Sequence, residues 1–251
     1  MRPVTVGMIK VVPKKWEPEA NLATLERLVP EIAKSGAEVI VTPEAFLDGY
    51  VIHGDDWTPE RMAEVSEPGP DGARAQRIRD IAAKAGVHLV AGWSEERDGK
   101  FYNTATLIDP KGAVIGQYDK LQVHPRYEYG KSIGVFETDF GTVGMMICAD
   151  RRWPEIARTL KLRGADIILM PTYGMKGTPN DIWMRTRSYE NAIWICFTHP
   201  EESLITDPRG NIAEQLTEGA EYLVHMCDLD MPGDAAMLAD RHPDVYGFRW
   251  E

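Results

Sequence analysis

The chain has 251 residues, of which 43% are hydrophobic and 27% are charged, and this composition excludes a disordered or collagen-like chain. The 28 lysine and arginine residues against 39 aspartate and glutamate residues leave a net charge of −11, which argues against a general binder of nucleic acid or anionic membranes. No apolar run approaches the roughly 18 residues of a membrane span, and the N-terminal apolar stretch, interrupted by Lys10, is too short for a signal peptide.

Apolar runs and helical patterns alternate along the chain, as in an α/β protein. Strands are predicted at residues 4–12, 38–41, 87–94, 103–108, 114–119, 143–148, 167–171, 193–198, 204–206, 212–216 and 222–228. Helices are predicted at residues 22–32, 72–85, 154–164 and 181–191. Pro30 is expected to kink or break the first helix. Residues 45–70 are rich in Gly, Pro and Asp, and we expect a long loop bordering the active site.

Two pairs of similar segments indicate an internal repeat. Residues 36–40 (GAEVI) resemble residues 164–168 (GADII), and residues 106–112 (TLIDPKG) resemble residues 204–210 (LITDPRG). We therefore expect two similar halves packed together rather than a solenoid. No linker or low-complexity segment divides the chain, so residues 1–251 are expected to form one domain.

The three cysteines, Cys148, Cys196 and Cys227, are odd in number and widely spaced, which does not indicate a disulfide framework or a zinc motif. The histidines also show no metal-ligand spacing. We therefore expect a reducing, cytoplasmic location, no bound metal, and buried or inert roles for Cys196 and Cys227.

Three chemically complementary residues follow predicted strands. Cys148 precedes a predicted helix, whose N-terminus favours a thiolate, although a buried structural cysteine is the more common case. Glu44 follows a buried strand, where desolvation suits a carboxylate to general-base work, and its ordinary alternative is a loop charge or helix cap. Lys120 also ends a strand, where a solvated lysine is the ordinary case. Together they predict an active site, because α/β sheets collect their sites at the carboxyl ends of strands.

The motifs around these residues resemble the nitrilase, or carbon–nitrogen hydrolase, superfamily over nearly the whole chain. The resemblance is carried by Pro43-Glu44, Tyr118-Asp119-Lys120-Leu121, Ile147-Cys148-Ala149-Asp150 and residues 141–144, 164–171, 187–191 and 207–210. It implies an α/β fold in the form of a four-layer αββα sandwich and a Glu–Lys–Cys triad.

In the mechanism that the resemblance implies, Glu44 takes the proton from Cys148 and later activates water. Cys148 attacks the carbonyl carbon and forms a thioester. Lys120 and the backbone N–H of Ala149 stabilise the oxyanion. No metal or organic cofactor is required.

The resemblance also implies supporting roles for other residues. Glu128, eight residues after Lys120, is expected to hold that lysine and touch the reacting centre, with a loop charge as the alternative. Gln122 stands where a histidine is frequent in the family. Expected pocket residues are Tyr50, Trp153, Tyr173 and Gly174, although Trp153 is also suited to a dimer interface. Asn103 and Asn191 match family positions and are expected to have structural roles.

The run Cys148-Ala149-Asp150-Arg151-Arg152-Trp153-Pro154-Glu155 resembles N-carbamoyl-D-amino acid hydrolases. Arg151 and Arg152 are therefore predicted to bind a substrate carboxylate, with pairing to Asp150 or Glu155 as the alternative. The first choice of substrate is an N-carbamoyl amino acid or a similar carboxylated linear amide. The alternatives are an ω-amidase or general aliphatic amidase, then a nitrilase, and, in a different class, a non-catalytic binding protein with the same fold.

Residues 231–251 show no strong element pattern yet carry Tyr246, Phe248 and Trp250. Aromatic side chains on a tail are suited to docking on a neighbouring subunit. We therefore expect a homodimer or a higher homo-oligomer.

Overall fold

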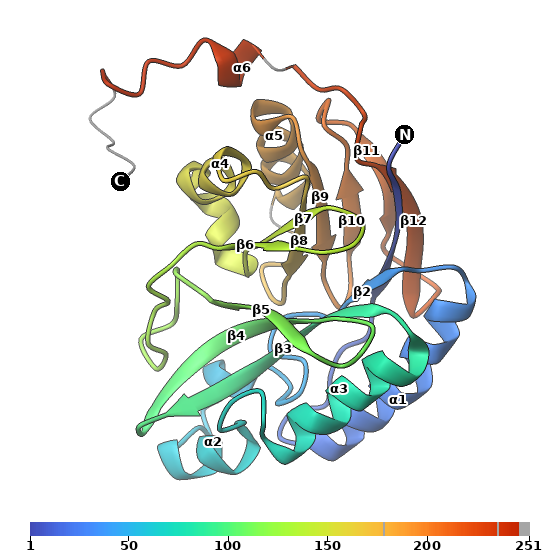
Figure 1. The fold of residues 1–251 in the computed structure, drawn as a ribbon. Coiled ribbons are helices and arrows are strands. Elements are labelled where there is room, and N and C mark those ends of the chain that lie inside the picture. Colours follow the sequence, from blue (N-terminus) through green and yellow to red (C-terminus); the bar gives the residue numbers. More distant parts are fainter. Residues whose placement is uncertain (178, 235, 246–251) are drawn as a thin grey trace.

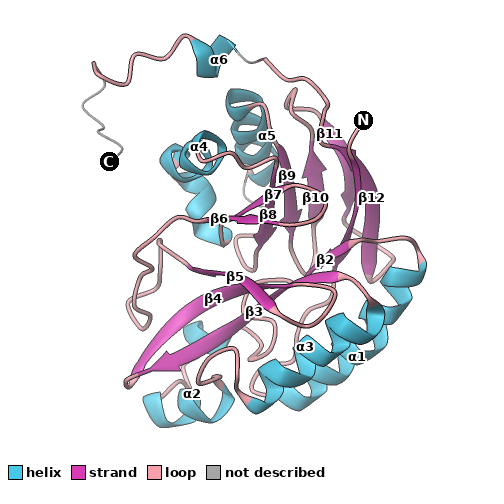
Figure 2. Ribbon diagram, viewed as in Figure 1, coloured by secondary structure: helices cyan, strands magenta, loops and turns pink. Residues whose placement is uncertain are grey.

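The computed structural model describes residues 1–177, 179–234 and 236–245. Two six-stranded sheets lie face to face, and helices cover the outer face of each (Figures 1 and 2). This arrangement confirms the predicted four-layer αββα sandwich.

The first sheet has the strand order β12-β1-β2-β3-β4-β5. Strands β1, β2 and β3 are parallel, and the other neighbours are antiparallel. Its elements are β1 (Pro3–Ile9), α1 (Pro18–Lys34), β2 (Val39–Val41), η1 (Val51–His53), α2 (Pro59–Val65), α3 (Ala73–Ala85), β3 (His88–Arg97), β4 (Lys100–Ile108), β5 (Val114–Asp119) and β12 (Tyr222–Asp228).

The second sheet has the order β11-β10-β9-β8-β7-β6, with β7, β8 and β9 parallel. Its elements are β6 (Val135–Glu137), β7 (Thr142–Met145), η2 (Cys148–Arg152), α4 (Pro154–Leu162), β8 (Ile167–Pro171), α5 (Asn180–Asn191), β9 (Trp194–Thr198), β10 (Ser203–Thr206) and β11 (Ile212–Leu216). A short helix, α6 (Ala236–Ala239), follows β12, and the Arg158 guanidinium on α4 donates to the Met237 carbonyl at 3.3 Å.

Three apolar layers hold the sandwich together, and strand alternation assigns side chains to them. On β8, Ile167 and Leu169 enter the layer between the two sheets, while Ile168 and Met170 pack under α4 and α5. On β2, Val39 and Val41 face the other sheet, and Ile40 packs under α1 and α3. Because both faces of these strands are covered, their sequences are continuous apolar runs rather than alternating apolar and polar residues.

The predicted internal repeat is confirmed by two matching turns. Asp109 Oδ1 accepts from the amides of Lys111 and Ala113, and Asp207 Oδ1 accepts in the same way from those of Arg209 and Asn211. Each turn then ends on a glycine in the left-handed region, Gly112 at φ +80° and Gly210 at +76°. The two halves thus use the same hairpin at the same place in each sheet.

Three sequence expectations need correction. Helix α1 runs through Pro30 without a break, because its buried face, which includes Leu25, Leu28 and Ile32, packs against the sheet. Residues 45–70 are not all loop: α2 begins at Pro59, after Thr58, whose side chain accepts from the Arg61 amide. Strand β6, which pairs with β7, was not expected.

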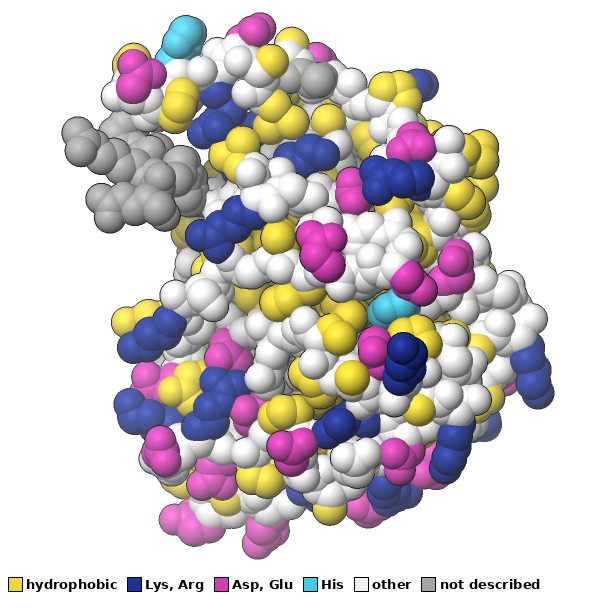
Figure 3. All heavy atoms as spheres, in the orientation of Figure 1, with side chains coloured by type: hydrophobic (Ala, Val, Ile, Leu, Met, Phe, Trp, Pro, Cys, Tyr) yellow, Lys and Arg dark blue, Asp and Glu magenta, His cyan; other side chains and the backbone are white. Residues whose placement is uncertain are grey.

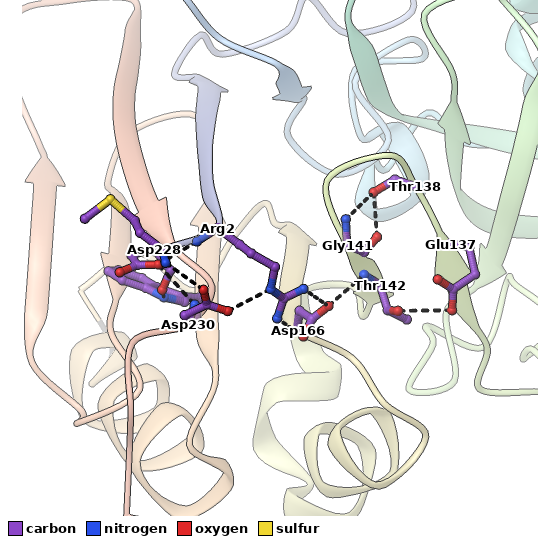
Figure 4. Close-up of polar contacts among 10 residues, drawn as sticks. Arg2, Glu137, Thr138, Gly141, Thr142, Asp166, Asp228 and Asp230 are labelled. Atoms are coloured by element: carbon purple, nitrogen blue, oxygen red, sulfur yellow. Dashed lines mark hydrogen bonds and ion pairs between the residues drawn. The ribbon is translucent and has the colours of Figure 1, made fainter.

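A cluster of charges joins the two sheets where the parallel strands begin (Figure 4). The Arg2 guanidinium, just before β1, donates to Asp166, just before β8, at 3.1 and 3.2 Å, and to Asp230 at 2.8 Å. Asp166 also accepts from the Thr142 amide at the start of β7. This edge is therefore occupied by structural ion pairs, and the carboxyl ends of β2, β7 and β8 lie at the opposite edge.

None of the described helices combines the length and the apolarity that a membrane crossing requires. On the face drawn in Figure 3, basic and acidic side chains are interspersed.

Candidate active site

Glu44, Lys120 and Cys148 each follow a strand that ends at the same edge of the sandwich. Glu44 comes after β2, Lys120 after β5 and Cys148 after β7. Strand β5 runs in the direction of β2, because two antiparallel pairings separate it from β3. The fold thus brings together the three residues that the sequence placed at strand ends.

Glu44 and Lys120 form a buried ion pair. Lys120 Nζ donates to Glu44 Oε1 at 2.5 Å, and the side chains are 6% and 0% exposed. Asn103 Nδ2 donates to the same oxygen at 2.8 Å, so Asn103 orients the carboxylate. The loop reaches this position because β3 carries Gly92, where a Cβ would lie 2.9 Å from the backbone of Pro43 and Ala45.

Lys120 is held in its charged form. Burial acts to lower its pKa, but the negative charge of Glu44, followed by smaller contributions from Cys148 and Asp150, raises the pKa above its ordinary value. Lys120 is therefore a fixed cation at this site rather than a base.

Cys148 begins η2 in a left-handed backbone conformation, with φ +46°, which is uncommon for a residue that has a side chain. Its Sγ donates to the Tyr173 carbonyl at 2.9 Å. Arg151 Nη1 donates to the same sulfur at 3.4 Å. The turn thus directs the thiol toward the loop that follows β8.

Burial and the negative charge of Glu44 raise the pKa of Cys148, and Lys120 and Arg151 oppose this increase. Cys148 is therefore a thiol at neutral pH. A nucleophilic reaction at this sulfur needs a base to remove the proton.

The main chain of Tyr173 contacts both the Cys148 thiol and the Glu44 carboxylate. Its N–H donates to Glu44 Oε2 at 3.0 Å, while its carbonyl accepts from Cys148. His199 supports the following residue, because its Nε2 lies 3.3 Å from the Gly174 carbonyl and its Nδ1 accepts from two backbone amides. Burial lowers the pKa of His199 to about 4, so it is neutral and acts here as a structural support.

A cavity of about 330 Å³ opens onto these groups. Its wall includes Tyr50, His53, Lys120, His124, Cys148 and Ala149. Ala149 is the second residue of η2, and N–H groups in the first turn of a helix have no partner within it. Its amide is thus suited to an oxygen bound beside the sulfur.

The expected pocket residues divide into two groups. Tyr50 lines the cavity, whereas Tyr173 stacks on Tyr50 with ring centroids 4.5 Å apart and, like Gly174 in the same loop, is not one of the wall residues. Arg152 and Trp153 instead point outward: both are exposed and stack on each other.

Two further assignments are corrected by the structure. The Glu128 carboxylate is 41% exposed and lies 3.4 Å from Lys100 Nζ, so Glu128 does not hold Lys120. The short segment between Lys120 and Glu128 turns its carboxylate to the surface. Arg151 is fully buried and lies against Cys148 rather than on the cavity wall. Neither arginine has an ion pair to Asp150 or Glu155 among the described residues.

Sequence reasoning missed three contributors to the site. His53 and His124 line the cavity with their rings edge to face, and burial lowers the pKa of both. Asp150, a buried residue of η2, accepts from the Tyr118 hydroxyl and the Ile147 and Gln122 amides, which anchors the nucleophile turn. The Asp in the Cys148-Ala149-Asp150 motif was the one available signal for this anchor.

The described ranges contain no cluster of three His, Cys, Asp or Glu side chains able to hold a metal ion. Asn191 has the structural role expected of it, because its side-chain amide donates to the Arg187 carbonyl.

Comparisons of the sequence and of the structure with known proteins agree with one another. The family described as carbon-nitrogen hydrolase matches residues 5–236. A protein named nitrilase from Pyrococcus abyssi is 32% identical over 91% of this chain and 90% of its own. A protein named omega-amidase NIT2 from Xenopus tropicalis is 26% identical over 84% and 83%. The structure of a variant of the amidase from Nesterenkonia sp. AN1 in complex with butyramide has a TM-score of 0.82 and 25% identity, covering 97% of this chain and 95% of that one.

Proposed function

Because this chain belongs to the carbon-nitrogen hydrolase family, we propose that it hydrolyses small linear amides through a thioester on Cys148. The observation that carries the proposal is the Cys148 thiol held by Tyr173 next to the buried Glu44–Lys120 pair. A buried ion pair carries a desolvation cost of several kcal/mol, so its place beside a nucleophile favours catalysis over a binding protein that only keeps the fold.

In the first half-reaction, Glu44 accepts the thiol proton, and the thiolate sulfur then bonds to the carbonyl carbon. The π electrons of the carbonyl move to its oxygen, which Lys120 and the Ala149 N–H stabilise. Collapse of this intermediate breaks the C–N bond, and the proton passes from Glu44 to the leaving nitrogen. Ammonia or an amine departs, and the thioester remains.

In the second half-reaction, Glu44 accepts a proton from water as the water oxygen bonds to the thioester carbon. The same donors stabilise the second oxyanion. The C–S bond then breaks, and Glu44 returns the proton to the sulfur. The carboxylic acid leaves, or, from an N-carbamoyl amino acid, a carbamic acid that decomposes to ammonia and CO₂, and the site regains its resting state.

Within this class, we propose a carboxylated linear amide: an N-carbamoyl amino acid first, because of the motif at residues 148–155, and an ω-amide acid second. Lys120, His53 and His124 offer hydrogen-bond donors to the cavity, and no Asp or Glu is found among the described residues of its wall. The names of the relatives keep two alternatives open, a neutral amide such as butyramide and a nitrile.

Ammonia release from N-carbamoyl-D-alanine, its L enantiomer, succinamate, butyramide and butyronitrile tests the proposal. We expect turnover of the amides, a higher kcat/KM for the carboxylated ones, and none with Cys148→Ala. Release from no probe, or full activity of Cys148→Ala, would overturn the thioester mechanism. A preference for butyramide would overturn only the carboxylate assignment.

A further inference from the structure

We propose that Arg151 is a further catalytic residue, whose buried guanidinium stabilises the Cys148 thiolate each time it forms in the cycle. The inference rests on the proposed thioester mechanism. It assigns Arg151 to the nucleophile instead of to a substrate carboxylate.

Arg151 lies against the nucleophilic sulfur but outside the cavity wall. Arg151 is 0% exposed, and its Nη1 donates to Cys148 Sγ at 3.4 Å. Both residues lie on η2, three positions apart, so the short helix sets their separation. Arg151 is not among the residues that line the cavity, so it approaches the sulfur from the protein side while the substrate approaches from the cavity.

The Arg151 guanidinium has no carboxylate partner among the described residues, and its Nε and Nη2 are buried without an acceptor. The guanidinium instead faces the rings of Trp183 and Phe197, with its carbon 5.3 and 5.5 Å from the centroids. Aromatic faces compensate a buried cation only in part. The one group beside Arg151 that gains a negative charge during the proposed reaction is Cys148.

The hydrogen bonds of the sulfur define when Arg151 acts. In the resting thiol, the S–H donates to the Tyr173 carbonyl. After Glu44 takes the proton, the sulfur has nothing to donate, and the carbonyl oxygen then faces a negative charge. Arg151 Nη1 is a donor that already points at this sulfur, and a hydrogen bond to a charged partner is stronger than one to a neutral partner.

The thiolate arises twice in each turnover. It forms once as the nucleophile before the C–S bond is made, and again as the leaving group when water displaces it from the thioester. In the thioester itself the sulfur carries no charge. A cation that binds the charged form of the sulfur more tightly than the neutral form therefore lowers the barrier to both half-reactions without tightening substrate binding.

Other titratable groups also face this sulfur or Arg151, namely Glu44, Lys120, Asp150, Tyr50 and His199. His199 is neutral. Lys120 also favours the thiolate, but it is paired with Glu44 in the resting site and stabilises the substrate oxyanion in the proposed reaction. Arg151 is the cation that donates a hydrogen bond to the sulfur itself.

The test compares Arg151→Met, which keeps an unbranched apolar stem but removes the charge, with Arg151→Lys, which keeps the charge. Arg152→Met is the matched control, because Arg152 is the next residue but is exposed. Alkylation of Cys148 by iodoacetamide is followed across pH, with the modified peptide identified by mass spectrometry. Thermal unfolding confirms that each variant is folded.

In Arg151→Met, we expect the midpoint of the alkylation profile to rise by about one pH unit or more. Below the midpoint, we expect alkylation to slow by about three- to tenfold, because higher thiolate basicity partly compensates for the smaller thiolate fraction. The alkylation midpoint of Arg151→Lys should fall between those of the parent and Arg151→Met, and the profile of Arg152→Met should match that of the parent. Amide turnover should lose kcat, with KM for succinamate and butyramide nearly unchanged.

A folded Arg151→Met protein with the parent's alkylation profile would overturn the inference, as would an equal shift in Arg152→Met. If Arg151→Met fails to fold, Arg151→Gln, which is polar but uncharged, takes its place, and a folded Arg151→Gln protein with the parent's alkylation profile would do the same. A rise of KM for succinamate alone would return Arg151 to substrate binding. Because alkylation needs no turnover, a protein that hydrolyses no amide yet shows the shift would fail the proposed function and not this inference.

Discussion

The Lys120 ammonium lies 2.5 Å from the Glu44 carboxylate, although 76 residues separate the two along the chain. Both side chains are buried, and Asn103 fixes the shared oxygen from a third segment. The pair places a proton acceptor next to a fixed cation that lines the cavity.

Replacing Glu44 with Gln should lower kcat by about 10²- to 10⁴-fold, because an amide cannot accept the thiol proton. Lys120→Met should cause a loss of similar size, since it removes the cation and leaves Glu44 buried without its partner. Steady-state kinetics with the best amide substrate measures both. Glu128→Gln should keep activity within about twofold, and a large loss there would show that Glu128 acts at the site despite its surface pairing with Lys100.

Cys148 should be the only essential thiol. Cys148→Ala is expected to abolish turnover, whereas Cys196→Ala and Cys227→Ala, both in the layer between the sheets, should lose stability rather than chemistry. Rapid acid quenching during turnover, followed by mass spectrometry, should find the acyl group on the peptide that contains Cys148. An adduct on either of the other two cysteines would contradict this assignment.

Stability should decrease as pH rises through the titration of Asp48. Burial raises its pKa from 3.8 to about 6 in the folded protein, so the folded state binds this proton more tightly than the unfolded chain does. The contribution of Asp48 is then fully present below about pH 4 and lost as pH rises through 6, a change of roughly 3 kcal/mol in the free energy of unfolding.

Urea unfolding of the parent and Asp48→Asn at several pH values between 4 and 7 isolates this contribution. The difference between the two proteins should change sharply with pH, whatever Asn costs through the amide of Ser94, which donates to Asp48 Oδ2 at 2.9 Å. A difference that stays constant with pH would place the pKa of Asp48 near its ordinary value.

Activity should not depend on a metal. The proposed steps use Glu44, Lys120, Cys148 and water, so prolonged incubation with a chelator should leave kcat unchanged. The assay is amide turnover before and after chelation. Loss of activity that zinc or magnesium restores would contradict the mechanism.

The chain should form a homodimer or a larger homo-oligomer in solution. Tyr246, Phe248 and Trp250, which motivate this expectation, lie outside the described residues. Light scattering at micromolar concentration should give at least twice the mass of one chain. The combined variant Tyr246→Ser, Phe248→Ser and Trp250→Ser should shift the protein toward monomer, and a parent that is monomeric throughout would end the idea.

The sequence alone determined the features that depend on local pattern. Strands β5, β8, β11 and β12 have their predicted limits, since apolar runs bounded by turn residues need no distant information. The order of Glu44, Lys120 and Cys148 at strand ends also indicated one site. Parallel strands must end at a common edge, so chain position implies proximity.

Only the tertiary structure decided which way the side chains around the nucleophile face. Arg151 and Arg152 are adjacent and chemically identical, yet one is buried against the sulfur and the other is exposed on the surface. Glu128 and His124 lie four residues apart, yet the glutamate is at the surface beside Lys100 and the histidine lines the cavity. Burial depends on packing between segments far apart in the chain, and for residues in turns and short helices no sequence period records it.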